Sequence, residues 1–359
     1  MSRLDPDLLD PAFAVARRHA EDGLAPFSVL AVANAAGTLR TAAVTAPGQA
    51  QPVTEDARCL IASITKPIVA TAVMRLHQEG RFPLDAPLAL WLPELASPDK
   101  RAITAWHVLT HTTGMEDPWL DRLVAGEPIT DRRTLIARAM AAPLAASVGS
   151  RYAYATITFD VLTAAIERAL DRPFEAILRE AVLDPLGMRS TDWEPDPAHA
   201  VPLDVLQWED DWRPGTRLAD VDVAPMRHRL VRLHLAGAGL HSTAADLVRF
   251  GRALLRGGEL DGTRILAPAF VDLMTREVTV GGLGQQQDRL LDNHYAIGWG
   301  KRNLTSPMSS RGFEHGGATG TRLLVDPEHD LVIVSLTGVW AQPGWTVEEA
   351  ISGVYAALR

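Results

Sequence analysis

The residues with the clearest chemical potential are a serine and a lysine three positions apart, Ser63 and Lys66. Residues at this spacing lie on the same face of a helix, so a hydroxyl and an amine would stand side by side if a helix begins here. An amine beside a serine can take the hydroxyl proton and activate the oxygen for attack on a carbonyl carbon. The pair therefore predicts acyl transfer through a covalent acyl-serine.

The same spacing also has a purely structural explanation, in which Ser63 caps the helix and Lys66 is a solvated residue of its first turn. Two features count against this explanation. A cation in the first turn opposes the helix dipole, which favours negative charge there. The neighbours Ile64 and Ile68 are apolar, and apolar surroundings favour a neutral amine. We therefore interpret Lys66 as a candidate base.

Composition narrows the class of protein. A chain of 359 residues with 47% hydrophobic content can form one large domain or two medium ones with substantial cores. The net charge is -9, so we do not expect the protein to bind nucleic acid or an anionic membrane. We expect a small-molecule acyl substrate instead. The sequence does not indicate the oligomeric state. No signal-peptide pattern or membrane-length apolar run is found, so we expect a cytoplasmic location. Cys59 lies in an apolar run and is expected to be buried.

Hydrophobic periodicity and turn residues predict a mixed order of helices and strands. The predicted helices cover residues 6–20, 63–78, 134–142, 158–170, 173–182, 244–255, 268–274 and 346–358. The predicted strands cover residues 27–33, 38–44, 295–300, 321–325 and 331–336. Strands are therefore expected near both ends of the chain, and helices in the middle.

This order predicts an α+β fold, with an antiparallel sheet flanked by helices and completed by both chain ends, residues 1–84 and 235–359. Residues 85–234 would form an inserted, mainly helical domain. Residues 194–222 are rich in proline and acidic side chains, which favours a long surface loop. Ser63 would then lie where the two domains meet, a common place for a pocket.

Five further motifs follow the Ser63 element. They are Val108–Met115 (VLTHTTGM), Gly149–Thr156 (GSRYAYAT), Pro185–Met188 (PLGM), Gly237–Leu247 (GAGLHSTAADL) and His315–Thr321 (HGGATGT). In this order the motifs resemble the serine β-lactamase-like and penicillin-recognising enzymes, in particular class C β-lactamases, D-alanyl-D-alanine carboxypeptidases and related bacterial esterases. The resemblance covers most of the chain and implies that family's fold, a helix-flanked antiparallel sheet with an all-helical domain.

The resemblance also implies roles for individual residues. Ser63 would be the nucleophile, and Lys66 would take or relay its proton. Tyr154 matches the tyrosine of the family's Tyr-x-Asn element, which exchanges protons with the nucleophile and the leaving group; a nearby ammonium would help its phenol ionise. The backbone N–H groups of Ser63 and Ala318 would form the oxyanion hole.

Two departures from the family pattern concern the substrate-binding positions. Thr156 replaces the asparagine of Tyr-x-Asn, so an amide that contacts the substrate is missing. His315, Gly316 and Gly317 replace the Lys-Thr-Gly element, which removes a cation and a hydroxyl that help hold a carboxylate; the histidine should be largely neutral at pH 7. The two glycines would let the substrate approach the strand closely. We therefore expect an ester or another acyl compound that lacks a carboxylate.

Other constellations are weaker. The chain has no Gly-x-Ser-x-Gly element, which argues against an α/β-hydrolase. His107 and His111 are four apart, but the His-Glu-x-x-His pattern is missing, so we interpret this element as structural and expect no metal and no cofactor. Trp208, Trp212 and Trp340 are candidates for lining an acyl pocket.

The sequence thus predicts a serine hydrolase that cleaves a small carboxylic ester through an acyl-enzyme on Ser63. Three alternatives stay open: an acyltransferase, a β-lactamase or D-amino-acid peptidase that uses the same site, and a non-catalytic binding protein on the same fold. The presence of Ser63, Lys66 and Tyr154 counts against the last of these.

Overall fold

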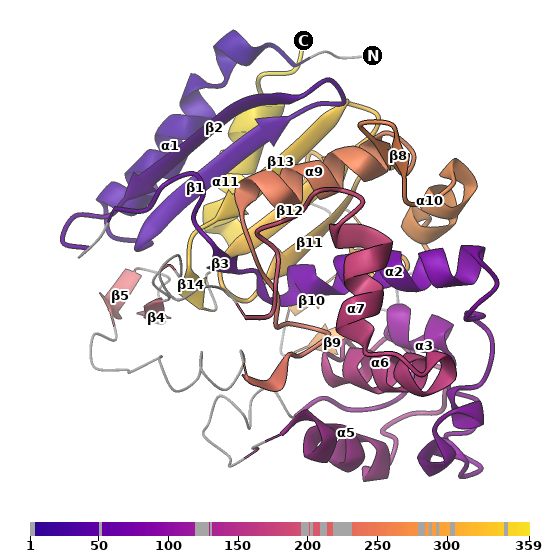
Figure 1. Ribbon diagram of the computed structural model, residues 1–359. Coiled ribbons are helices and arrows are strands. Elements are labelled where there is room, and N and C mark those ends of the chain that lie inside the picture. The colour runs from indigo at the N-terminus through magenta and orange to yellow at the C-terminus, as the bar shows by residue number, and fades with distance from the viewer. Residues whose placement is uncertain are drawn as a thin grey trace.

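The structure, a computed structural model, describes residues 4–49, 52–118, 129, 131–194, 201, 204–208, 214–217, 232–278, 284–286, 289–291, 294–301, 306–340 and 344–359. Figure 1 shows two parts that lie side by side, a sheet with helices on both of its faces and a group of helices beside it. Within the described ranges, none of the helices combines the length and the apolar character needed to cross a lipid bilayer.

The main sheet has five strands in the order β11-β12-β13-β1-β2, and every neighbouring pair is antiparallel. Its strands are β1 (Phe27–Ala33), β2 (Thr38–Thr45), β11 (Phe313–Gly317), β12 (Thr321–Asp326) and β13 (Leu331–Leu336). Two strands come from the N-terminal part of the chain and three from the C-terminal part, joined where β1 pairs with β13. This confirms the predicted α+β fold, in which both chain ends complete one sheet.

Helices cover both faces of this sheet, which explains why all seven residues of β1 are buried. Leu30 and Val32 point into a core with α1 (Asp10–Glu21) and α11 (Gly344–Tyr355), which pack together. The alternate residues, such as Val29, point into a larger core that includes α9 (Ala244–Leu255) and α2 (Thr65–Gln78). Because successive side chains of a strand point to opposite faces of the sheet, each β1 side chain packs against one of the two helix layers.

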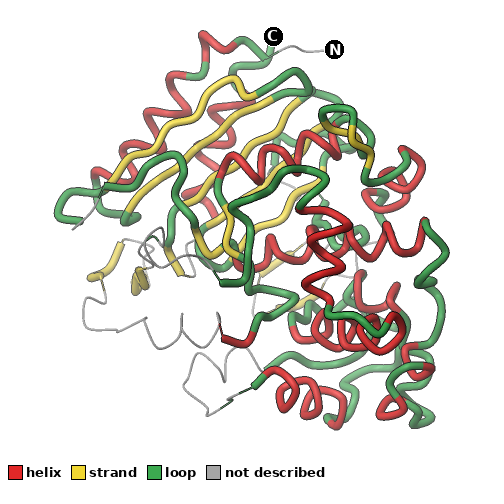
Figure 2. Tube along the Cα trace, viewed as in Figure 1, coloured by secondary structure: helices red, strands yellow, loops and turns green. Residues whose placement is uncertain are grey.

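Most of the remaining helices form the second part, which Figure 2 shows as a group of red coils below the sheet. Residues 157–163 are all buried, so the first two turns of α6 are surrounded by protein on every side. The other α-helices in the described part of the chain are α3 (Ala105–Leu109), α5 (Arg132–Ala141), α6 (Ile157–Leu170), α7 (Phe174–Leu178) and α10 (Pro268–Thr275). A π-helical turn, Arg179–Leu183, continues α7.

Short elements connect the larger ones. The two-stranded pairs are β3 (Cys59–Leu60) with β6 (His241–Ser242), β7 (Glu259–Leu260) with β8 (Thr263–Arg264), and β9 (Gly284–Gln286) with β10 (Arg289–Leu291). The 3-10 turns are Pro6–Leu8, Ala62–Ile64, Leu88–Leu90 and Pro93–Leu95. The pair β3–β6 lies directly before Ser63 and joins the nucleophile region to the segment that precedes α9.

The region near residues 194–222, which we expected to be a loop, contains two strands. They are β4 (Asp204–Trp208) and β5 (Pro214–Arg217), which pair with each other. β4 also pairs in parallel with β14 (Val339–Trp340), close to the end of the main sheet. Composition alone did not reveal this pairing, because the partner strand lies more than 100 residues away in the sequence.

The predicted strand at residues 295–300 is wrong, because this segment is a tight turn. Ala296 N donates to Trp299 O at 2.7 Å, which closes the turn. Gly298 has a φ of +73°, and a Cβ atom there would lie 2.4 Å from the Cβ atom of Ala70. The segment resembles a strand in sequence because its apolar residues, including Trp299, are buried in the core.

Candidate active site

Ser63 lies on a 3-10 turn, and the α-helix behind it begins at Thr65, slightly later than predicted. The preceding residue, Ala62, has a φ of +44°, which is the left-handed region. A non-glycine residue in this conformation costs on the order of 1–3 kcal/mol, so the surrounding structure must hold it. Thr65 Oγ1 does so by donating to Ala62 O at 2.6 Å. The chain therefore bends sharply at the candidate nucleophile.

Lys66 points from the first turn of α2 into the protein, and its side chain is fully buried. Its Nζ atom donates to Ser63 Oγ at 3.1 Å, to Thr156 Oγ1 at 3.2 Å and to the carbonyl oxygen of Gly237 at 2.9 Å. The carbonyl can only accept, whereas both hydroxyl groups can also donate. A neutral amine can therefore keep the bond to Gly237 and direct its lone pair at the Ser63 hydroxyl.

Burial shifts the charge state of this lysine. Loss of solvation lowers the pKa of Lys66 to about 7, while the carboxylates of Asp117 and Asp160 act in the opposite direction. A substantial fraction of Lys66 is therefore neutral at pH 7. This agrees with the expectation that apolar surroundings favour the amine.

Tyr154 is also close to Lys66. Nζ of Lys66 lies 4.6 Å from the centre of the Tyr154 ring. Burial raises the pKa of the Tyr154 phenol, and a hydrogen bond with Ser63 offsets this only in part. The expectation that a nearby ammonium would help this phenol ionise was therefore wrong. Tyr154 stays protonated at neutral pH and is suited to donate a hydrogen bond or a proton.

A carboxylate that the sequence did not reveal positions Thr156 at the N-terminus of α6. Asp117 Oδ2 accepts hydrogen bonds from the backbone N–H groups of Thr156 and Ile157, the latter at 3.1 Å. A carboxylate at this end of a helix also interacts favourably with the helix dipole. Asp117 thus caps α6 from a distant segment and holds the Thr156 hydroxyl beside Lys66.

The loop that presents the Gly237 carbonyl is also held by α6. Asp160 Oδ1 accepts from the backbone N–H of Ala236 at 2.9 Å and pairs with Arg132 Nε at 2.7 Å. Gly237 packs tightly here, since a Cβ atom would lie 2.5 Å from the carbonyl oxygen of Thr156. These contacts position the carbonyl oxygen of Gly237, the third hydrogen-bond acceptor of Lys66.

The end of β11 packs against the turn that carries Ser63. Gly317 must be glycine because a Cβ atom there would lie 2.3 Å from the carbonyl oxygen of Ile61. Thr321 Oγ1 donates to the same oxygen at 3.1 Å, and Thr319 Oγ1 donates to Leu60 O at 2.5 Å. Gly317 thus permits close contact between two backbone segments, a different reason from the substrate approach that we expected.

The other residues predicted for this strand end lie in place around the same turn. Gly316 has more room than Gly317, since the nearest atom to an added Cβ is 3.6 Å away. Ala318 directly follows β11, so its N–H and that of Ser63 remain the predicted oxyanion hole. His315 is buried, and loss of solvation lowers its pKa to about 3, so it is neutral at pH 7.

Several residues at the site had no role assigned from the sequence: Asp117, Asp160, Gly237 and Tyr295. His111 had been interpreted only as structural. Gly237 and His111 lie inside motifs that the sequence showed, so those motifs were the available signal. Asp117, Asp160 and Tyr295 had no such signal, because their positions depend on contacts across the fold.

Predictions about other side chains had mixed outcomes. Cys59 is buried, as expected, and Trp299 is buried in the core. Trp340 is half-buried and packs against the large core. The side chains of Trp208 and Trp212 lie outside the described part of the chain, so their predicted role in an acyl pocket stays a prediction.

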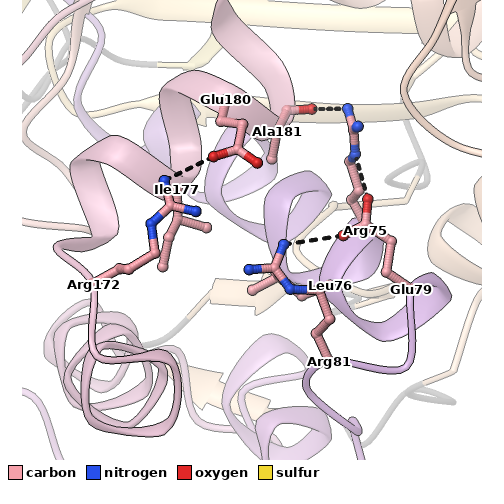
Figure 3. A pocket seen from close by; sticks show the side chains of 8 residues that line it. All are labelled: Arg75, Leu76, Glu79, Arg81, Arg172, Ile177, Glu180 and Ala181. Atoms are coloured by element: carbon pink, nitrogen blue, oxygen red, sulfur yellow. Dashed lines mark hydrogen bonds and ion pairs between the residues drawn. The ribbon is translucent and has the colours of Figure 1, made fainter.

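Two cavities in the described part of the chain lie away from Ser63. Figure 3 shows the smaller, with a volume of about 10 Å³, crossed by the ion pairs Arg172–Glu180 and Arg75–Glu79. It lies at the far end of α2 and has room for about one water molecule. The larger, of about 350 Å³, lies between α9, α10 and β11, and its lining carries both cations and carboxylates. Neither is lined by the residues that surround Lys66.

Comparison with known proteins gives one family and several relatives. The family model described as Beta-lactamase matches residues 15–343. Protein Rv1367c of Mycobacterium tuberculosis is 30% identical over 322 residues, which cover 79% of this chain and 78% of that protein. Esterase EstB of Burkholderia gladioli is 35% identical over 226 residues, 55% of this chain and 57% of the esterase. The solved structure of EstCE1, described as a hydrolase with promiscuous acyltransferase activity, has a TM-score of 0.81 at 21% identity and covers 98% of this chain and 99% of its own.

Proposed function

The chain belongs to the β-lactamase family, and from this premise we propose that it is a serine esterase that cleaves a small carboxylic ester through an acyl-enzyme on Ser63. The observation that carries this proposal is the contact of 3.1 Å between Ser63 Oγ and a buried Lys66 amine whose pKa is about 7. Such an amine is matched in basicity to proton transfer at neutral pH. EstB, an esterase by name, supports the choice of ester among the family's substrates.

In the first step, Ser63 Oγ forms a bond to the ester carbonyl carbon while its proton passes to Lys66 Nζ. The carbonyl oxygen gains a negative charge, which the N–H groups of Ser63 and Ala318 stabilise. The C–O bond to the alcohol then breaks. Tyr154, which stays protonated, donates to the departing alkoxide and regains a proton from the Lys66 ammonium. Water attacks the acyl-serine by the same steps and releases the acid.

The charge around the site favours substrates without a carboxylate. His315 is neutral, whereas the Lys-Thr-Gly element that this segment resembles would place a cation here, and Thr156 Oγ1 is already bound to Lys66. The nearby cation Arg322 lies on the opposite face of the sheet, where it pairs with Glu314 at 3.1 Å and Glu348 at 3.2 Å. Among the described residues, a carboxylate at this strand end would therefore lose hydration without gaining an ion pair from His315 or Arg322.

A panel of chromogenic substrates tests the proposal: a short-chain ester, a long-chain ester and a cephalosporin, each with the wild type and Ser63→Ala. We expect ester turnover that falls at least about 1,000-fold in Ser63→Ala, as for other enzymes that lose a nucleophile. Ester turnover that survives this substitution would contradict the mechanism. Cephalosporin turnover that exceeds ester turnover would contradict the substrate class and favour a β-lactamase or peptidase.

Acyl transfer differs only in the acceptor that consumes the acyl-enzyme. Product analysis with and without an added alcohol separates the two reactions, since a transferase forms the new ester in preference to the acid. A non-catalytic binding protein would fail to react with a fluorophosphonate probe at Ser63, whereas an activated serine is labelled. Lys66→Met should retain the fold but lose most of this labelling, because the base is removed.

A further inference from the structure

Beside the site, three buried side chains from separate segments form one continuous hydrogen-bond chain. His111 Nε2 lies 3.2 Å from the hydroxyl of Tyr295, and the same hydroxyl lies 3.0 Å from His315 Nε2. His111 lies in the Val108–Met115 motif, two residues after the end of α3, Tyr295 begins the turn after the described pair β9–β10, and His315 lies on β11. The sequence separations are 184 and 20 residues, so only the fold brings these groups together.

Backbone groups at both ends of the chain determine the direction of its hydrogen bonds. At one end, the N–H of Ala155 donates to His111 Nδ1 at 3.1 Å, so that nitrogen must accept. At the other end, His315 Nδ1 lies 2.8 Å from the carbonyl oxygen of Gly316, which can only accept, so this nitrogen must carry the proton. Burial lowers the pKa of both histidines, so each ring carries a single proton at pH 7.

These two constraints lead to the same arrangement from either end. The proton of His111 is on Nε2 and is donated to the Tyr295 oxygen. The Tyr295 hydroxyl donates in turn to His315 Nε2, whose ring proton on Nδ1 is donated to Gly316. A second proton on His315 would be on Nε2, so that both His111 and His315 would present an N–H to the Tyr295 oxygen. The Tyr295 hydroxyl could then no longer donate its hydrogen bond to His315. The chain therefore opposes protonation of His315.

The geometry points to Tyr295 as a positioning residue: its hydroxyl holds His315 with both ring nitrogens occupied, so that the end of β11 offers neither a cation nor a free ring N–H to a substrate carboxylate. This inference rests on the proposed function and narrows its substrate class to acyl compounds that have no carboxylate at this position. Tyr295 does not itself take part in the reaction. It acts through His315 and through the backbone carbonyl of Gly316.

The inference predicts a spectroscopic signature in the intact protein. With ¹⁵N-labelled histidine, His315 should show the Nδ1–H tautomer at pH 7, assigned by comparison with His315→Gln. In Tyr295→Phe the donor to Nε2 is lost while the Gly316 carbonyl still accepts from Nδ1, so we expect Nδ1 to stay protonated and the Nε2 resonance to move to that of a nitrogen without a donor or of an imidazolium. An Nε2–H tautomer or an imidazolium in the wild type would overturn the inference, and this measurement needs neither a folded Tyr295 variant nor ester turnover.

A matched pair of substrates tests the consequence for selectivity, namely a 4-nitrophenyl ester of glutaric acid with its second carboxyl either free or as the methyl ester. For Tyr295→Phe, we expect kcat/KM for the free acid to rise about tenfold relative to the methyl ester, mainly through KM, because His315 can then take a proton on Nε2 and donate it in a hydrogen bond to the carboxylate. An unchanged ratio, with a changed His315 signal, would overturn the role in selectivity.

Tyr355→Phe is the matched control. Tyr355 is also a buried tyrosine, and its hydroxyl donates to Asp326 Oδ2 at 2.8 Å on the other side of the sheet. Tyr355→Phe also removes a buried tyrosine hydrogen bond, but one on the opposite side of the sheet from His315. Its ratio of kcat/KM for the free acid and the methyl ester, and its His315 signal, should therefore match those of the wild type. If the wild type hydrolyses no ester, the proposed function fails. The inference about Tyr295 can still be tested without turnover, by the tautomer of His315 in the wild type and by the binding of monomethyl glutarate to Tyr295→Phe.

Discussion

At the scale of single residues, burial changes what the Lys66 side chain can do. Its pKa is about 7 in the folded protein, against 10.5 for an exposed lysine. Between pH 7 and 10.5 the unfolded chain keeps a proton on Lys66 that the folded protein has released, so the free energy of unfolding increases with pH over this range. Below pH 7 both states are protonated, and the folded protein is destabilised by the full cost of burying the charge. The same group that lowers stability at neutral pH supplies the base, which is a common compromise at active sites.

The pH dependence of ester hydrolysis should follow this lysine. Because the neutral amine is the reactive form, kcat/KM should rise with pH through an apparent pKa near 7 and then level off. Initial rates with a short-chain chromogenic ester between about pH 5 and 9, corrected for spontaneous hydrolysis, measure this profile. A rate that decreases as pH rises through 7 would show that the ammonium is the required form.

Neutralising Asp117 should move the same profile. Its carboxylate raises the pKa of Lys66, so Asp117→Asn should shift the rise in kcat/KM to lower pH, while the amide oxygen can still accept from the N-terminus of α6. Glu94→Gln, which removes a surface carboxylate paired with Arg168, is the control and should leave the profile in place. A shift to higher pH in Asp117→Asn would contradict the assigned electrostatics.

At the scale of elements, the site depends on how closely the end of β11 approaches the turn before α2. This distance is held by the hydroxyls of Thr319 and Thr321, which donate to carbonyl groups just before Ala62. The contact also holds the strained backbone that precedes Ser63. The sheet therefore positions the nucleophile directly, without a separate loop between them.

Gly317→Ala should disturb this approach. The added Cβ would lie 2.3 Å from Ile61 O and 2.2 Å from Thr321 Oγ1, so β11 or the Ser63 turn must move by about 1 Å, and kcat/KM should fall by about 100-fold. Gly316→Ala, where the nearest atom is 3.6 Å away, should cause a much smaller loss. Both variants are compared by ester kinetics and thermal unfolding. Equal losses would mean that the close contact at Gly317 is unimportant.

At the scale of the whole molecule, the two ends of the chain must meet before the sheet is complete. β1 pairs with β13, and α1 packs against α11 on the same face. The helices approach closely at Gly353, where a Cβ atom would lie 2.9 Å from Ala12 Cα. Stability therefore depends on contacts between residues more than 300 positions apart.

Gly353→Val should weaken this contact by forcing α1 and α11 apart. We expect the free energy of unfolding to decrease by about 1–3 kcal/mol, the usual cost of overpacking, with ester turnover at low temperature nearly retained. Urea unfolding followed by tryptophan fluorescence measures the change. Gly37→Ala is the control, since nothing lies within 4 Å of its added Cβ. Stability equal to the wild type in Gly353→Val would contradict the tight packing.

Local periodicity was sufficient to predict most of the elements. β1, β13 and α9 have the predicted bounds, because alternation and helical spacing are properties of short segments. Periodicity failed at residues 295–300 because a buried turn has the same apolar composition as a strand. It also failed at β4, since pairing with β14 depends on a partner distant in the sequence.

The closeness of Ser63 and Lys66 was determined by the sequence itself, because one helical turn fixes the distance between residues three apart. The tertiary structure decided how that pair is surrounded: Asp117, Asp160 and Tyr295 come to the site from distant segments, and no motif in the sequence pointed to them. The apolar neighbours of Lys66 predicted the direction of its pKa shift, but the tertiary structure decided how large the shifts of Lys66 and His315 are, since both depend on complete burial. Complete burial requires several segments of the assembled fold around one side chain, which the spacing of residues along the chain does not specify.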